Sequence, residues 1–141
     1  MILKVKKTDT RAKLPSYALA DDAGLDLFAL EDYTVPAGKF LAGIRTGVAF
    51  EIPAGYVGLC WDKSGLAAKY GLKVMAGVID SGFRGELLLT VLNTSNKDYH
   101  FSVGDKVMQI LIQPVERMEV VEVSELSDSH RGEGSFGSTG K

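Results

Sequence analysis

The fold is decided by one stretch of sequence, Gly77-Val78-Ile79-Asp80-Ser81-Gly82-Phe83-Arg84-Gly85-Glu86, and by the apolar run over residues 87–92 that follows it. Two apolar segments in this stretch flank a short turn bounded by glycines, which predicts a β-hairpin. The run over 87–92 is nearly all apolar and is typical of a strand buried on both faces. We therefore expect a β-protein with this strand in its core.

Further β-forming segments recur on both sides of this stretch, with turn residues about every 8–12 positions, the pattern of an all-β sandwich or barrel. They cover residues 2–5, 33–35, 39–44, 46–52, 56–61, 107–115 and 118–123. Only residues 64–70 predict a helix, with Ser64 as its N-cap and Gly71 as its C-terminal stop. The sequence thus predicts an all-β fold with one short helix.

Composition excludes several classes of function. The 141 residues suit one domain, and the net charge of −2 with a pI near 5.7 lacks the basic character of a protein that coats nucleic acid. The single cysteine excludes a disulfide framework and cysteine-based zinc sites. No apolar run reaches the roughly 18 residues of a membrane span. We expect a cytoplasmic protein whose partners include neither nucleic acid nor a membrane.

The last fifteen residues differ in composition from the rest of the chain. Residues 127–141 are rich in glycine and serine, and Phe136 is their only large apolar side chain. Such a segment buries too little apolar surface to fold alone, which predicts a β domain over 1–126 and a flexible arm over 127–141. The arm is either a linker without function or, with its aromatic ring, Arg131 and hydroxyls among glycines, a clamp for a planar anionic ligand.

Three internal segments carry polar side chains on turn-rich backbone. Residues 20–27 hold an acidic cluster that suits a hard cation, or else form a solvated turn. Lys63, Ser64 and Gly65 at a helix start suit phosphate oxygens, or else belong to a plain capped helix. Asp80 follows two β-branched residues; partial desolvation there favours a carboxylate that accepts a proton, unless it merely begins the turn.

Taken in order, these segments resemble the five motifs of the trimeric dUTPase family, over nearly the whole chain. The corresponding stretches are Ala23-Gly24-Leu25-Asp26-Leu27, Lys63-Ser64-Gly65-Leu66-Ala67, residues 77–85, Gly104-Asp105-Lys106-Val107-Met108-Gln109 and residues 131–140. Each motif alone is weakly specific, whereas five in order are strongly specific. The resemblance implies a jelly-roll or β-clip-type barrel and a homotrimer that exchanges its C-terminal arms between subunits.

The resemblance also implies a reaction and the residues that perform it. The reaction is Mg²⁺-dependent hydrolysis of dUTP to dUMP and pyrophosphate, by in-line attack of water on the α-phosphate. Asp80 is the implied general base, and Asp26 is implied to hold Mg²⁺ through water. The implied substrate contacts are Lys63, Ser64, Gly65 and Gln109 at the phosphates, Val78, Ile79 and Leu88 at uracil, Phe83 at the deoxyribose, and Arg131, Phe136, Gly137, Ser138 and Thr139 in the closing arm.

Three positions depart from the family pattern. Lys63 stands where the family usually has arginine, so the charge is kept and the bidentate fork is lost. Phe83 replaces a usual tyrosine, which keeps the ring face without the phenol. Ser135 replaces a usual glycine, which is unfavourable by about 1 kcal/mol if that position needs a positive φ.

Two alternatives share the fold. dCTP deaminases, including bifunctional ones, carry a catalytic glutamate on the strand after the third motif, and here that position is Thr90, which lacks the needed carboxyl group. A catalytically silent nucleotide-binding regulatory protein is the second alternative, although such a protein has no need to keep the site side chains. Pyrophosphate release from dUTP, ammonia release from dCTP and binding alone distinguish the three.

Overall fold

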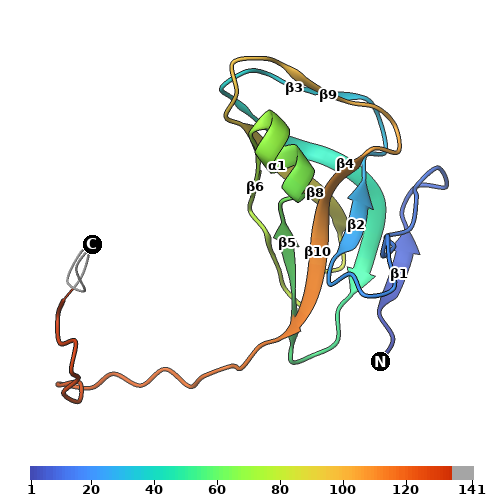
Figure 1. The fold of residues 1–141 in the computed structure, drawn as a ribbon. Helices are drawn as coiled ribbons and strands as arrows, with labels where there is room; N and C mark the ends of the chain where they lie inside the picture. Colours follow the sequence, from blue (N-terminus) through green and yellow to red (C-terminus); the bar gives the residue numbers. More distant parts are fainter. Residues whose placement is uncertain (135–141) are drawn as a thin grey trace.

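The computed structural model describes residues 1–134, and they form two four-stranded sheets and a two-stranded ribbon (Figure 1). The first sheet has the order β1-β4-β8-β6, the second β2-β10-β5-β7, and β3 pairs with β9. The elements are β1 (Lys4–Lys7), β2 (Leu25–Phe28), β3 (Tyr33–Val35), β4 (Phe40–Glu51), β5 (Tyr56–Trp61), α1 (Ser64–Tyr70), β6 (Leu72–Met75), β7 (Val78–Ile79), β8 (Glu86–Asn93), β9 (Tyr99–Phe101) and β10 (Lys106–Pro114).

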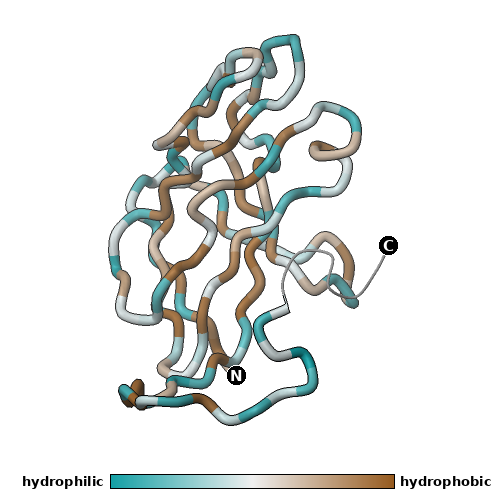
Figure 2. Tube along the Cα trace, turned by 90° about the vertical axis from the view of Figure 1, so that its left-hand side faces the viewer, coloured by the Kyte–Doolittle hydropathy of each residue, from teal (hydrophilic) through white to brown (hydrophobic). Residues whose placement is uncertain are grey.

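Both sheets contribute to one apolar core. Leu27 and Ile110 come from the second sheet, Ile44 and Leu89 from the first, and all four are buried. Figure 2 shows apolar stretches along the strands of this body and hydrophilic ones in many of the connecting loops. The predicted all-β jelly-roll class with one short helix is confirmed.

The strand β8 is buried on one face only. Its side chains alternate between core and surface, so that Leu87 and Leu89 are buried whereas Leu88 is 54% exposed. The prediction of burial on both faces is therefore wrong. An unbroken apolar run does not reveal whether the outer face of a sheet is covered.

The predicted hairpin over residues 77–86 is also wrong. β7 pairs with β5 in the second sheet, and β8 pairs with β4 and β6 in the first. Residues 80–85, called the Asp80 turn below, therefore carry the chain from one sheet to the other. Two apolar segments around a glycine-bounded turn give the same pattern for a hairpin and for such a crossing.

Two segments that the sequence separates form the single strand β4. Its register against β8 shifts between Ala42 and Ile44 and again between Arg45 and Ala49. Gly43 and Gly47 have φ values of +82° and +67° at these irregularities. The glycines thus mark bulges within a strand, not its ends.

The helix α1 spans Ser64–Tyr70, the range that the sequence predicts, but its N-cap differs from the prediction. Lys63 is its N-cap and makes no side-chain capping hydrogen bond, while Ser64 is the first helical residue. The prediction that Ser64 is the N-cap is therefore wrong. Gly71 ends the helix in the left-handed region with φ +67°, as predicted.

After β10, residues 115–134 form neither strand nor helix and lead away from the body (Figure 1). The strand predicted over 118–123 is absent, because no edge in the described chain pairs with it. Several apolar side chains of this segment are exposed, namely Val115, Met118, Val120, Val121, Val123 and Leu126. No helix within residues 1–134 is long and apolar enough to cross a membrane.

Candidate functional site

An open cavity of about 490 Å³ lies where the end of β5, the start of α1 and β10 meet, and we call it the Lys63 cavity. It brings together three residues that the sequence predicts for one site, Lys63, Ser64 and Gln109. The complete lining is Asp22, Ala23, Gly24, Trp61, Asp62, Lys63, Ser64, Gln109 and Leu111.

Asp26 is the charged centre behind this cavity. It lies on β2, level with Gln109 of β10, and is only 2% exposed, so the alternative of a solvated turn is wrong at this residue. The Lys63 ammonium donates a hydrogen bond to Oδ1, and the Lys106 ammonium lies 2.6 Å from Oδ2. The Lys106 contact is a close charge pair that lacks the alignment of a good hydrogen bond.

The electrostatics of Asp26 follow from these contacts. Burial raises the pKa of the Asp26 carboxyl, but the contacts with Lys106 and Lys63 lower this pKa by more. The net pKa is therefore below its ordinary value, and the carboxylate stays ionised between two ammonium groups. Lys106 belongs to the motif over 104–109, but the position of Lys106 in that motif did not predict its contact with Asp26.

Asp62 fixes the segment that leads into α1. Its carboxylate accepts hydrogen bonds from the Val74 N–H at 2.6 Å and from Lys73 Nζ at 2.7 Å, both on β6. Its carbonyl oxygen accepts a hydrogen bond from Gln109 Nε2 at 2.9 Å. A Cβ at Gly24 would lie 2.4 Å from Gln109 Oε1, so glycine is needed there for this side chain to fit. Sequence reasoning missed the role of Asp62.

A second cavity, of about 250 Å³, lies beside the Asp80 turn, and we call it the Phe83 cavity. Phe83 is 44% exposed, and its ring lies so close to Gly85 that a Cβ there would be 2.7 Å from Cζ. The cavity gathers all five residues predicted for the base, the sugar and the catalytic carboxylate. The lining is Val78, Ile79, Asp80, Phe83, Glu86, Leu87 and Leu88.

The two cavities of one chain share no lining residue, and the two side chains that would act on phosphate, Asp80 and Lys63, belong to different cavities. Ile79 pairs with Gly58, so Asp80 falls level with Val57 on β5. Lys63 follows Val57 by six residues, which is roughly 20 Å at about 3.3 Å per residue. Asp80 and Lys63 of the same chain therefore do not reach one phosphate group.

The arm contributes one described residue to the predicted set. Arg131 Nε donates a hydrogen bond to the Gly134 carbonyl oxygen at 2.8 Å, within the segment that leads away from the body, and Arg131 lines neither cavity. Phe136, Gly137, Ser138 and Thr139, together with Ser135, lie outside the described residues. The domain boundary at residue 126 and the closing arm stay predictions.

Comparison with known proteins assigns the chain to a family. Residues 10–140 match the family model described as dUTPase. The chain belongs to the dUTPase family. The deoxyuridine 5'-triphosphate nucleotidohydrolase of Nautilia profundicola is 43% identical over 143 residues and is aligned over 100% of each chain. Its Clostridium tetani counterpart is 43% identical over 141 residues, covering 99% of this chain and 97% of that protein.

Solved structures of dUTPases have the same fold. The Staphylococcus bacteriophage 80alpha dUTPase with dUpNHpp superposes with a TM-score of 0.91 at 30% identity, over 99% of both chains. A mutant dUTPase from phage phi11 of S. aureus, described with a structural Mg(II) ion, has a TM-score of 0.81 at 28% identity, over 89% of this chain and 98% of that one. These comparisons favour a dUTPase over the deaminase alternative.

Proposed function

We propose that Asp80 is the general base with which this dUTPase hydrolyses dUTP to dUMP and pyrophosphate. Two carboxylates line the Phe83 cavity, and only one of them is available. Glu86 already accepts hydrogen bonds from Arg45, Gly47 and Thr8, whereas Asp80 is exposed and forms no ion pair within residues 1–134. A general base needs a free oxygen within reach of the attacking water, and this observation carries the assignment.

Uracil and deoxyribose would occupy the rest of the Phe83 cavity. β7 is the edge strand of its sheet, so the outward backbone groups of Val78 and Ile79 are available to the polar edge of a base, as they would be to another strand. Leu88 offers an exposed apolar surface in the same cavity. The Phe83 ring would lie against the deoxyribose and leave no room for a 2′-hydroxyl.

The triphosphate would bind in the Lys63 cavity. Lys63, Ser64 and Gln109 supply one ammonium, one hydroxyl and one amide to it. A Cβ at Gly65 would meet nothing within 4 Å, so packing does not require glycine there and the open backbone leaves room for a phosphate. Because Lys63 is bonded to Asp26, phosphate oxygens would compete with Asp26 for the Lys63 ammonium.

The donor set fits a Mg²⁺ ion carried by the triphosphate. Residues 1–134 contain no group of three His, Cys, Asp or Glu side chains that could hold a metal, and Mg²⁺ commonly takes phosphate oxygens and water as ligands. Asp26 would hold this ion through water. When bound, the ion supplies charge neutralisation of the phosphates, whereas water activation rests on Asp80.

A complete site would form between chains of a homotrimer. The roughly 20 Å between Asp80 and Lys63 of one chain supports a site in which the Phe83 cavity of one subunit faces the Lys63 cavity of another. The exposed apolar side chains over 115–126 support exchange of the C-terminal segment, because they have no cover within the described chain. Residues 131–139 would then close over a site built by other subunits.

The test is pyrophosphate release from dUTP by Asp80→Asn. We expect kcat to fall by about 10²–10⁴-fold, the usual contribution of a general base, with binding of dUpNHpp nearly unchanged. Asp21→Asn, which replaces an exposed carboxylate outside both cavities, is the matched control and should keep wild-type kcat. An Asp80→Asn enzyme within threefold of wild-type kcat would remove Asp80 from the mechanism.

A further inference from the structure

The Asp80 turn depends on its two ends for support. No ladder joins β7 to β8, and β7 pairs with β5 over two residues only. Within the turn, the Phe83 N–H donates to the Asp80 carbonyl at 3.1 Å, and Arg84 Nη1 donates to the Ser81 and Phe83 carbonyls at 2.6 and 2.8 Å. Hydrogen bonds within the turn therefore stabilise its conformation. Its position relative to the two sheets depends on the contacts of the residues at its ends, Ile79 and Glu86.

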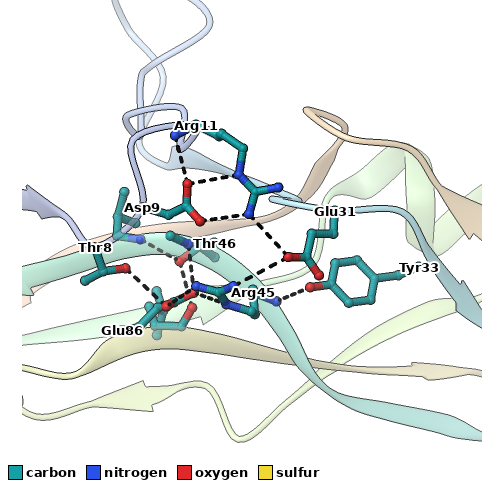
Figure 3. A network of polar contacts seen from close by, with 11 residues as sticks. Thr8, Asp9, Arg11, Glu31, Tyr33, Arg45, Thr46 and Glu86 are labelled. Atoms are coloured by element: carbon teal, nitrogen blue, oxygen red, sulfur yellow. Dashed lines mark hydrogen bonds and ion pairs between the residues drawn. The ribbon is translucent and has the colours of Figure 1, made fainter.

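At the second end, the Glu86 carboxylate receives four hydrogen bonds (Figure 3). Arg45 donates from Nε at 3.1 Å to Oε1 and from Nη2 at 3.0 Å to Oε2. The Gly47 N–H donates to Oε1 at 2.9 Å, and the Thr8 hydroxyl to Oε2 at 3.1 Å. We call these four contacts the Glu86 clamp; they join β8 to β4 and to the segment after β1.

The bulge in β4 makes this clamp possible. Gly47 has φ +67° and lies where the β4–β8 register jumps between Arg45 and Ala49, which frees its N–H for Glu86. Its carbonyl oxygen accepts a hydrogen bond from the Thr8 N–H at 2.8 Å. A Cβ at Gly47 would lie 2.7 Å from Cβ of Ala12, so both the backbone conformation and the packing favour glycine.

The clamp is strong enough to locate the backbone around it. A bidentate arginine–carboxylate pair fixes direction as well as distance, and its hydrogen bonds are charge-assisted. The hydrogen bonds from Arg45 lower the pKa of Glu86, so its carboxylate stays ionised and the pair stays formed near neutral pH. The Glu86 side chain is only 18% exposed, which limits competition from water.

The clamp is adjacent to the surface on which Phe83 rests. Gly85 immediately precedes Glu86, and the Phe83 ring lies against Gly85. We propose that Glu86 is a positioning residue: by fixing the backbone at Gly85 it sets the pose of Phe83, and through it the selection of deoxyribose over ribose. This inference rests on the proposed function, in which Phe83 lies against the deoxyribose.

The test is the ratio of kcat/KM for dUTP to kcat/KM for UTP, which does not depend on the fraction of enzyme that is folded. A merely structural role for Glu86 would therefore leave it unchanged. We expect Glu86→Gln to lower the ratio by about tenfold, because an amide places an N–H group against a donor and displaces the turn. Glu51→Gln, in the exposed pair with Lys4 on the same sheet, should leave the ratio within about twofold.

A second pair of variants keeps the test decisive if Glu86→Gln fails to fold. Thr8→Val removes one hydrogen bond to Glu86 and keeps the side-chain shape, and we expect it to lower the ratio by about threefold. Thr8→Ser keeps the hydroxyl and should restore the wild-type ratio. A wild-type ratio in both Glu86→Gln and Thr8→Val would overturn the inference.

Phe83→Ala separates the inference from the function on which it rests. If Phe83→Ala lowers the dUTP/UTP ratio and the clamp variants do not, the role of Glu86 is wrong while that of Phe83 stands. If Phe83→Ala leaves the ratio unchanged, ribose is excluded elsewhere, and both the role of Phe83 and the inference from Glu86 fall.

Discussion

Behind the Lys63 cavity the Asp26 carboxylate is buried and already balanced by two ammonium groups, whereas in the Phe83 cavity the Asp80 carboxylate is exposed and forms no ion pair within residues 1–134. This difference in burial and charge pairing matches the roles proposed for the two cavities, phosphate binding in the first and proton abstraction in the second. A buried and neutralised Asp26 would hold lysines in place for an anionic ligand, while a base must keep an oxygen free for a proton. One cavity is thus organised by charge pairing and the other by the geometry of a turn.

The sharpest contrast between the halves is in folding stability. Asp26→Asn would leave Lys63 and Lys106 without their partner, and we expect the free energy of unfolding to fall by about 3 kcal/mol. Asp80→Asn should change it by less than about 0.5 kcal/mol, because Asp80 is exposed. Urea unfolding at one fixed protein concentration measures both. Equal stabilities of the two variants would contradict the contrast.

The next effect concerns the competition between Asp26 and phosphate for Lys63. Lys63→Ala should lower kcat/KM for dUTP by about tenfold or more, since the ammonium is lost, and Lys63→Arg should preserve or improve it through bidentate contacts. Steady-state pyrophosphate release measures both variants. Wild-type kcat/KM in Lys63→Ala would show that this lysine serves only to neutralise Asp26.

A smaller effect tests the ion pair of Glu86, the second carboxylate of the Phe83 cavity, by pH. The hydrogen bonds from Arg45 hold the pKa of Glu86 below its ordinary value of 4.5, despite some burial. Their contribution to stability is therefore fully present above about pH 4.5 and is lost as the pH falls through the lower pKa of the folded state. Between about pH 5 and pH 3, the free energy of unfolding should fall less steeply in Glu86→Gln than in the wild type. Parallel curves would contradict the assignment of the clamp to Glu86.

The sequence predicted some features of the two cavities and missed others, and the missed features are those that depend on distant partners. Local patterns were sufficient for most strands and for the helix. The resemblance to the dUTPase family, and not periodicity, grouped Lys63, Ser64 and Gln109 in one cavity and the predicted residues between 78 and 88 in the other. Neither was sufficient for the burial of Asp26 in an acidic segment, because its partners come from two other motifs. Glu86 was missed because Thr8 and Arg45 are 78 and 41 residues away in sequence. The partners of a turn or strand depend on long-range contacts that periodicity does not encode.

The measurement that most directly tests a site shared between subunits is complementation. Asp80→Asn chains and Lys63→Ala/Ser64→Ala chains are each purified, then unfolded and refolded together in equal amounts. Asp80→Asn chains keep an intact Lys63 cavity, and the doubly substituted chains keep an intact Phe83 cavity. When the chains assemble at random, each half of a shared site is intact with a probability of one half, so about a quarter of all sites have both halves intact. We predict pyrophosphate release at about a quarter of the wild-type rate. A rate no higher than the sum of the two variants refolded separately would contradict the shared site.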